Sequence, residues 1–354
     1  MASHSPLPCF AARAEHLRQR VVHLYKDGNM AFLEGLGLAG YRSFGDELQF
    51  IGPFKKINVL IGQNNAGKSN VLAFIRNHLS DIAKAQGGGS WRADTMDYHL
   101  TDQGHAFRVA LGIDPMGPNL ELLVAPIGLQ HLEAFRTILN QDVVQQNGLA
   151  WFIHSSHTLG GKLELDRSTW SDRRDSPLTQ PLRNAWHHAL TRKGLSGLDA
   201  TNMQRATMDV NPATLKYPPV HLVPAIRNVV KGEMKDGDFS GMGLIDRLAL
   251  LQNPNSISAD RMKPFNAIKT FVRSVLENEE ATIEIPEARN TILVHLDGKT
   301  LPLSSLGTGI HEVIILAASA TIVEHSIMCI EEPELHMHPT LQQKFWSACL
   351  PLLC

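Results

Sequence analysis

Apolar residues recur along this chain with two different spacings, which predict where strands and helices lie. Residues 57–61 form a compact apolar run rich in β-branched side chains, the pattern of a buried parallel strand. Soon after it, apolar residues at positions 71, 72, 75, 79 and 82 have the spacing of one helix face. We therefore expect a strand, a glycine-rich loop and a helix to follow one another near the N-terminus.

The rest of the chain alternates between short strand candidates and helical periodicity. Residues 1–29 are expected to be an appended tail, 30–166 and 281–354 the two parts of one core domain, and 167–280 a helical insertion. Between 105 and 166, short apolar runs separated by Gly, Pro and Asn suggest an antiparallel layer. Strands are predicted at 31–38, 47–51, 106–113, 120–124, 162–165, 220–226, 282–285, 291–296 and 327–330, and helices at 14–25, 182–192, 243–252, 265–278, 309–323 and 341–350.

Composition narrows the class of protein. Of the 354 residues, 43% are hydrophobic and 19% are charged, which is ordinary for a soluble globular chain. The formal net charge of −2 is not the global signature of a nucleic-acid binder. No apolar stretch of about 18 residues runs without charge or proline, so no membrane span is expected. The four cysteines lack C-x-x-C spacing, which suits a reducing cytoplasm and argues against disulfides and a zinc knuckle.

The glycine-rich loop at 62–69, Gly-Gln-Asn-Asn-Ala-Gly-Lys-Ser, matches the phosphate-binding pattern G-x-x-x-x-G-K-[ST]. Its glycines let successive N–H groups point inward, and the following helix directs its positive dipole end at the same place. Lys68 would reach the β- and γ-phosphates of ATP, and the Ser69 hydroxyl would bind Mg²⁺. A chance glycine-rich turn is the plainer alternative. The predicted nucleotide-binding residues of this loop are Gly62, Asn64, Asn65, Ala66, Gly67, Lys68, Ser69 and Asn70.

Two carboxylates follow a second apolar run. Residues 327–330 lead directly into Glu331 and Glu332, which predicts a buried strand whose carboxyl end delivers acids to the nucleotide. Glu331 would orient the magnesium shell, and Glu332 would polarise the attacking water. The alternative is a strand followed by solvated acids, and the P-loop upstream favours the catalytic interpretation.

A third motif, Gly307-Thr308-Gly309, lies in a Ser/Gly-rich stretch just before a predicted helix. Free N–H groups at a helix start can bind phosphate, although a Ser/Gly turn that merely caps a helix is commonplace. The position of this stretch, after the P-loop and just before the acidic strand, favours a role at the nucleotide.

The order of these three motifs resembles the ABC-type ATPase heads of the OLD (overcoming lysogenization defect) and RecF/SMC-like families. The run at 331–339, Glu-Glu-Pro-Glu-Leu-His-Met-His-Pro, looks particularly like the OLD group, as do residues 41–44 and 223–227. The similarity covers roughly 31–350, although 115–215 carry no matching motif. It implies an α/β P-loop NTPase fold with ABC-type head architecture, a mixed central sheet, an antiparallel β-layer and a helical insertion.

Carried onto this sequence, the family pattern assigns a role to each motif. Phosphate binding falls to 65–69, magnesium to Ser69 and Glu331, and the general base to Glu332, with Lys68 as the catalytic cation. Gly307, Thr308 and Gly309 would meet the γ-phosphate bound by a second protomer, and His338 would lie on a loop that crosses the dimer interface. Asp is commoner than Glu at position 331 across P-loop ATPases. The strand with a switch histidine and the Toprim nuclease domain of OLD proteins would both lie beyond Cys354, so we expect the chain to lack its C-terminal portion.

The predicted function is ATP binding and hydrolysis by a head that forms a homodimer on ATP. The resemblance implies that it gates a nuclease or another effector in phage defence or DNA maintenance. Two alternatives remain open at this stage: a switch that binds ATP without hydrolysing it, and a RecF-type head that binds DNA.

Other polar clusters have plainer explanations. His336 and His338 could share a metal, but no third ligand is nearby in the sequence. His187 and His188 are expected on a helix surface. Residues 154–157, His-Ser-Ser-His, are expected to be an ordinary loop.

Overall fold

The computed structural model describes residues 31–86, 94–99, 107–141, 145–156, 162–166, 179–227, 229, 239–253, 262–322 and 325–352. The chain forms two compact units. The first comprises Met1–Asn70 and Asn77–Tyr217, and the second comprises Val71–Arg76 and Pro218–Cys354. The predicted tail at 1–29 with its helix, and the glycine run at 87–90, lie outside the described residues. The four-segment domain organisation stays a prediction.

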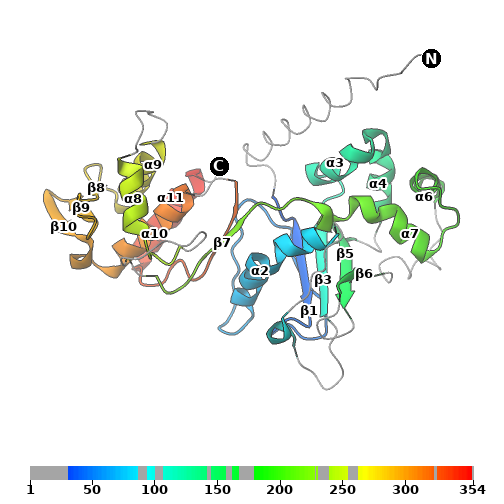
Figure 1. Ribbon diagram of the computed structural model, residues 1–354, viewed down its shortest axis with the longest axis horizontal. Helices are drawn as coiled ribbons and strands as arrows, with labels where there is room; N and C mark the ends of the chain where they lie inside the picture. Colours follow the sequence, from blue (N-terminus) through cyan, green and yellow to red (C-terminus); the bar gives the residue numbers. More distant parts are fainter. Residues whose placement is uncertain are drawn as a thin grey trace, which may run out of the picture. The chain divides into compact units, whose positions relative to one another are not determined.

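The first unit is built on an antiparallel sheet with strand order β2-β1-β3-β5-β4, and β6 pairs with β5 (Figure 1). This sheet confirms the predicted antiparallel layer. Gly35 lies opposite Gly112 in the β1–β3 ladder, and a Cβ on Gly112 would come within 3.1 Å of the Trp151 ring. The glycine pair therefore leaves room for that indole. The strands are β1 (Gly35–Ala39), β2 (Gln49–Ile51), β3 (Phe107–Ile113), β4 (Gln145–Gln146), β5 (Leu149–Ser156) and β6 (Glu164–Leu165).

Helices accompany this sheet, and several bury apolar faces against one another. Phe135 on α4 and Trp186 on α6 are fully buried in one cluster, and α6 also packs against α7. The predicted helices after the P-loop and at 182–192 are confirmed. The helices are α2 (Lys68–Gln86), α3 (Pro118–Val124), α4 (Leu132–Leu139), α6 (Gln180–Arg192) and α7 (Ala200–Thr207), with short 3₁₀ turns η1 (Thr95–Asp97), η2 (Ala125–Ile127), η3 (Leu129–His131), η4 (Met208–Val210) and η5 (Pro212–Thr214).

Two predictions for this unit are wrong. Residues 120–124 are part of helix α3, because Pro118 occupies its first turn and Leu120, Leu123 and Val124 are buried at helical spacing. The expected loop at 154–156 is the end of β5, an eight-residue strand that is buried along most of its length. His154 is fully buried, and its Nε2 lies 3.0 Å from Nδ2 of Asn211, the residue just before η5. His157 lies outside the described residues.

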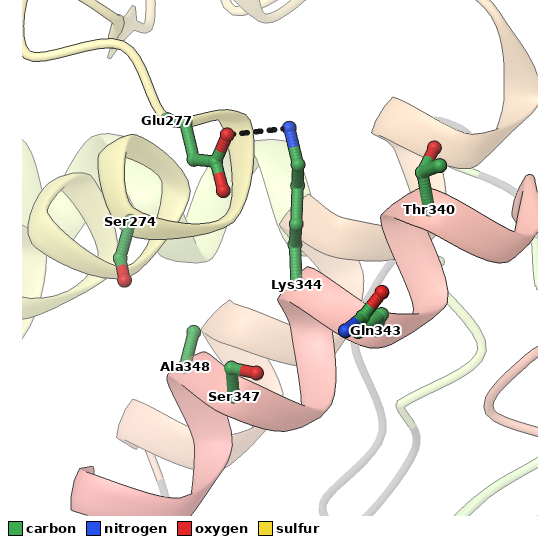
Figure 2. A pocket seen from close by; sticks show the side chains of 7 residues that line it. All are labelled: Ser274, Glu277, Thr340, Gln343, Lys344, Ser347 and Ala348. Carbon is green, nitrogen blue, oxygen red and sulfur yellow. Dashed lines mark ion pairs between the residues drawn. The ribbon is translucent and has the colours of Figure 1, made fainter.

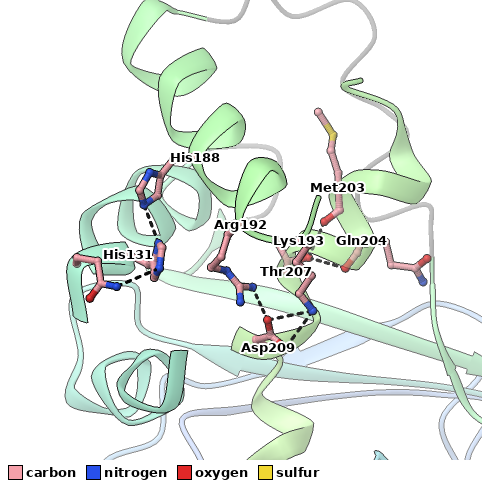
Figure 3. A network of polar contacts seen from close by, with 9 residues as sticks. His131, His188, Arg192, Lys193, Met203, Gln204, Thr207 and Asp209 are labelled. Atoms are coloured by element: carbon pink, nitrogen blue, oxygen red, sulfur yellow. Dashed lines mark hydrogen bonds and ion pairs between the residues drawn. The ribbon is translucent and has the colours of Figure 1, made fainter. Parts of the chain in front are cut away.

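A network of polar contacts joins η3, α6 and η4 (Figure 3). Lys193 donates a hydrogen bond of 3.0 Å to Asp209, which also pairs with Arg192. The His131 and His188 rings are joined by a 2.6 Å contact between Nδ1 and Nε2. His187 and His188 are exposed, as predicted. These contacts hold the helices together, and none of them involves a residue of the predicted nucleotide site.

The described residues of the second unit comprise the Val71–Arg76 part of α2, four further α-helices, a three-stranded antiparallel sheet and a parallel strand pair. The strands predicted at 282–285 and 291–296 are confirmed as β8 and β9, which pair antiparallel, and β10 adds a third strand. Helix α9 packs against α10 and α11 around a core that includes Phe271 and Phe345. The elements are β7 (Val220–Val223), α8 (Leu244–Gln252), α9 (Lys263–Leu276), β8 (Thr282–Glu284), β9 (Leu293–Leu296), β10 (Lys299–Pro302), η7 (Leu303–Ser305), α10 (Thr308–Ile322), β11 (Ile327–Ile330) and α11 (Pro339–Leu352).

The mixed central sheet stays a prediction. Among the described residues, the pair β7–β11 is parallel, and the two larger sheets are antiparallel throughout. The expectation of a buried strand at 57–61 is wrong. Val59 and Ile61 are 62% and 92% exposed, and no strand of the described chain pairs with this segment. Without a ladder partner, the backbone groups of an apolar run gain nothing from the strand conformation. Where the structure describes the chain, no helix is long and apolar enough to cross a membrane.

Candidate functional site

The P-loop turns sharply just before α2. Asn65 and Gly67 have φ angles of 66° and 88°, both in the left-handed region. A left-handed residue between right-handed ones aims successive backbone N–H groups toward the same side, which is the geometry of an anion-binding nest. The residues from Gly62 to Ala66 are exposed. The first turn of α2 has no acidic residue to compete for those N–H groups.

Lys68 and Ser69 lie where α2 begins. Lys68 Nζ donates hydrogen bonds of 2.8 Å to the carbonyl oxygens of both Gly62 and Gln63. The ammonium group therefore links the end of the loop to its first two residues. The Ser69 side chain is exposed. Asn70 Nδ2 donates to Ser43 Oγ at 2.8 Å. The structure therefore brings the predicted phosphate-binding residues together on one turn, with a cation and a free hydroxyl at the helix start.

Residues 41–44 pack against the P-loop turn. A Cβ on Gly67 would lie 2.9 Å from Ser43 Oγ and 3.3 Å from the Phe44 ring, so only glycine fits there without movement. Arg42 Nε donates to Asp97 Oδ1 at 2.9 Å, and the other Asp97 oxygen lies 3.0 Å from His78 Nε2. Burial lowers the pKa of His78, and the Asp97 charge opposes that shift. Sequence reasoning missed Asp97 and His78, because nothing in the local pattern links them to the loop.

The predicted catalytic acids follow β11. Glu331 N–H donates to the Val223 carbonyl at 2.9 Å, which extends the β7–β11 ladder by one residue. Glu331 is half-buried, whereas Glu332 is exposed and has a left-handed φ of 41°. A non-glycine residue with this φ is strained, and such strain is common at functional positions. A turn follows, closed by a hydrogen bond from Leu335 N–H to the Glu332 carbonyl.

The signature residues lie at the start of α10, in contact with the same turn. Gly307 and Thr308 are exposed, and a Cβ on Gly307 would meet nothing within 4 Å. A Cβ on Gly309 would come within 3.0 Å of Leu341 Cδ2 and 3.3 Å of the His336 carbonyl. The start of α10 therefore packs closely against the segment that follows the acids. His338 Nδ1 contacts Thr340 Oγ1 at 2.8 Å and caps the start of α11.

The predicted residues fall into two groups. The P-loop residues belong to the first compact unit, and Glu331, Glu332 and the signature belong to the second. The donor set suits Mg-ATP: backbone N–H groups and an ammonium for phosphate, and hydroxyl and carboxylate oxygens for Mg²⁺. Within the described ranges, no three His, Cys, Asp or Glu side chains form a protein-only metal site. Among these residues, His336 and His338 have no third ligand with which they could hold a metal ion.

A separate hollow of about 430 Å³ lies between α9 and α11 (Figure 2). Lys344 crosses it to form a 2.8 Å ion pair with Glu277. Its lining contains Ser274, Thr340 and Gln343 but none of the predicted nucleotide-binding residues. This hollow is a polar gap between two helices and is not the candidate site.

Comparison with known proteins supports an ATPase. Residues 244–353 match the AAA ATPase domain family. This stretch contains the signature and both acids and leaves out the P-loop. No curated protein matches the chain. Among solved structures, one titled "Crystal structure of the SmcHead bound to the C-winged helix domain of ScpA" is similar with a TM-score of 0.44 and 13% sequence identity, over 91% of this chain and 86% of that chain.

The family match supports an AAA-type ATPase domain at residues 244–353, which implies the use of ATP. The resemblance to the OLD family stays a prediction.

Proposed function

We propose that this chain binds ATP with Mg²⁺ and hydrolyses it to ADP and phosphate. The observation that carries the proposal is the turn before α2, where two left-handed residues precede an exposed helix start with Lys68 and Ser69 on it. A loop of this shape offers backbone N–H groups, a helix dipole and an ammonium to one anion. The match to AAA ATPase domains supports the same activity from a different part of the chain.

Lys68 would exchange its partners when nucleotide binds. Its two hydrogen bonds now go to the carbonyls of Gly62 and Gln63, and phosphate oxygens would replace one or both. A charged acceptor makes a stronger hydrogen bond than a carbonyl, so the exchange favours the bound state. The exposed Ser69 hydroxyl and the Glu331 carboxylate would hold Mg²⁺, which neutralises the developing phosphate charge.

Glu332 would accept the proton of the attacking water as that water bonds to the γ-phosphorus and the bond to the β-phosphate oxygen breaks. An exposed carboxylate on a strained turn has the acceptor capacity and the access to solvent for this role. Gly307, Thr308 and Gly309 would meet the γ-phosphate of a second protomer, so that ATP joins two heads. On the family resemblance, this dimer gates a nuclease or another effector in the cytoplasm.

The test is to replace Lys68 by Ala and measure binding of a non-hydrolysable ATP analogue with Mg²⁺ by calorimetry. Loss of a charged hydrogen-bond donor should weaken binding about 10- to 100-fold. Lys56→Ala is the matched control, because it removes the same charge from an exposed residue shortly before the loop. Equal affinity for the parent and Lys68→Ala would refute the proposed phosphate site.

A further inference from the structure

A buried arginine lies at the carboxyl end of β11. Arg227 follows β7 by four residues, and none of its side-chain surface is exposed. Its Nη2 donates to the carbonyl oxygens of Glu331 and Glu332 at 2.9 and 2.8 Å. One nitrogen therefore contacts both peptide groups that flank the Cα of Glu332.

These two hydrogen bonds restrain the backbone of Glu332. The Glu331 carbonyl belongs to the peptide before its Cα, and the Glu332 carbonyl belongs to the peptide after it. Holding both carbonyls on one nitrogen limits the rotation of either peptide about that Cα. Glu332 has a left-handed φ of 41°, a conformation that L-residues with a Cβ rarely adopt without support.

The other end of the guanidinium faces α10. Arg227 Nη1 lies 2.9 Å from Glu312 Oε2, and only 3% of the Glu312 side chain is exposed. The contact is an ion pair that is not aligned as a hydrogen bond. A buried guanidinium needs a nearby opposite charge, so Glu312 keeps Arg227 in place through its charge. Glu312 lies one turn after Thr308, where α10 begins.

We propose that Arg227 is a positioning residue for Glu332, and that the Glu312–Arg227 ion pair couples the signature end of α10 to the conformation of that acid. The inference rests on the proposed function, in which Glu332 handles the attacking water. A shift of α10, such as contact with a second protomer would produce, would move Glu312 and with it the guanidinium. The P-loop is not part of this network, whereas the proposed Mg²⁺ ligand Glu331 is. Affinity for ATP without Mg²⁺ should therefore not depend on the network.

The first test compares Arg227→Lys with the parent. Lys keeps the positive charge but, as a single ammonium on a flexible stem, cannot hold two carbonyls and a carboxylate in the planar arrangement of a guanidinium. We expect kcat for phosphate release to fall about tenfold or more, with ATP affinity measured without Mg²⁺ within about twofold of the parent. Arg247→Lys on α8, whose side chain is exposed, is the matched control and should change neither quantity.

Glu312→Gln tests the second half of the network, because it keeps the shape of the side chain and removes its charge. We expect a smaller fall in kcat, and the double variant Arg227→Lys, Glu312→Gln should be no slower than Arg227→Lys alone. Independent structural damage would instead give additive losses. Additive losses, or an unchanged kcat in Arg227→Lys, would overturn the coupling.

A readout that does not need turnover separates this inference from the proposed function. Amide hydrogen exchange in residues 327–338 should be faster in Arg227→Lys and Glu312→Gln than in the parent, while α8 exchanges at the parent rate. A parent that releases no phosphate would refute ATP hydrolysis and, with it, the catalytic role of Glu332. Unchanged exchange in 327–338 would refute the positioning by Arg227, whether or not the parent is an ATPase.

Discussion

The stability of the first unit should depend on pH through one buried acid, Glu34. It lies just before β1, is only 9% exposed, and accepts a 2.7 Å hydrogen bond from the Asp114 N–H. Burial raises the pKa of this carboxyl from 4.5 to about 7, against the opposing effect of that hydrogen bond. The perturbation is Glu34→Gln, which keeps the shape and an acceptor oxygen but cannot ionise.

The sign follows from proton uptake. The folded chain holds a proton on Glu34 at pH values where the unfolded chain has lost it, so this group stabilises the fold below pH 4.5. That stability is lost as the pH rises toward about 7. Between about pH 5 and about pH 8, the parent should lose about 2.5 kcal/mol of unfolding free energy from this group.

The assay is urea unfolding of the parent and Glu34→Gln at both pH values. The variant should gain about 2 kcal/mol or more relative to the parent over that interval, because every other titrating group is common to both proteins. Glu47→Gln, which removes an exposed carboxylate from the same unit, serves as the control and should show no comparable gain. A difference between Glu34→Gln and the parent that is constant with pH would show that Glu34 is not buried as a neutral acid.

Two further predictions concern the catalytic groups. Glu332→Gln should lower the rate of phosphate release about 100-fold or more, while calorimetry finds Mg-ATP affinity unchanged; equal rates in parent and variant would favour the non-hydrolysing switch. Gly307→Asp should leave ATP binding by the monomer intact and prevent ATP-driven dimerisation in light scattering, since its Cβ meets nothing within 4 Å. Gly309→Asp should in addition lose about 1–3 kcal/mol of stability, because its Cβ would lie 3.0 Å from Leu341 Cδ2. If Gly307→Asp loses ATP binding as a monomer, the signature acts within one head or is structural.

The elements that the sequence predicted well are those whose signal is local. Helix α2 starts at Lys68, where the glycine-rich loop ends, and its buried residues Val71, Ile75 and Leu79 recur at helical spacing. Strand β11 was predicted from four apolar residues followed by two acids. In both cases a few neighbouring residues are enough to predict the type of element and where it begins or ends.

Residues 57–61 and 120–124 show the limits of the same reasoning. Both are short apolar runs, and periodicity alone cannot separate a strand from a helix or an extended segment at that length. Pro118 was the overlooked signal for α3, since proline favours the first turn of a helix. For 57–61 the missing information is the ladder partner, which is a property of the fold and not of the run.

Contacts between residues far apart in the chain could not be predicted from the sequence. Asn211 contacts His154 Nε2 across 57 residues, and Arg227 contacts the carbonyls of Glu331 and Glu332 across more than 100. Sequence reasoning noted 223–227 as part of a resemblance but had no physical role for the arginine. The role proposed for Arg227 rests on contacts with the end of β11 and with Glu312 that no local pattern indicates.

The motifs divide the proposed chemistry between the two compact units. On the proposed function, the first unit holds the groups that would bind phosphate, Lys68 and the loop N–H groups, and the second holds the acid that would accept a proton from water, Glu332. The family match covers only part of the second unit, so the P-loop pattern and the match to AAA ATPase domains are separate observations. The P-loop pattern and the family match come from different residues and indicate the same activity. One ATPase explains both observations better than two coincidences do. On the proposed function, neither unit alone carries the chemistry needed to turn over ATP.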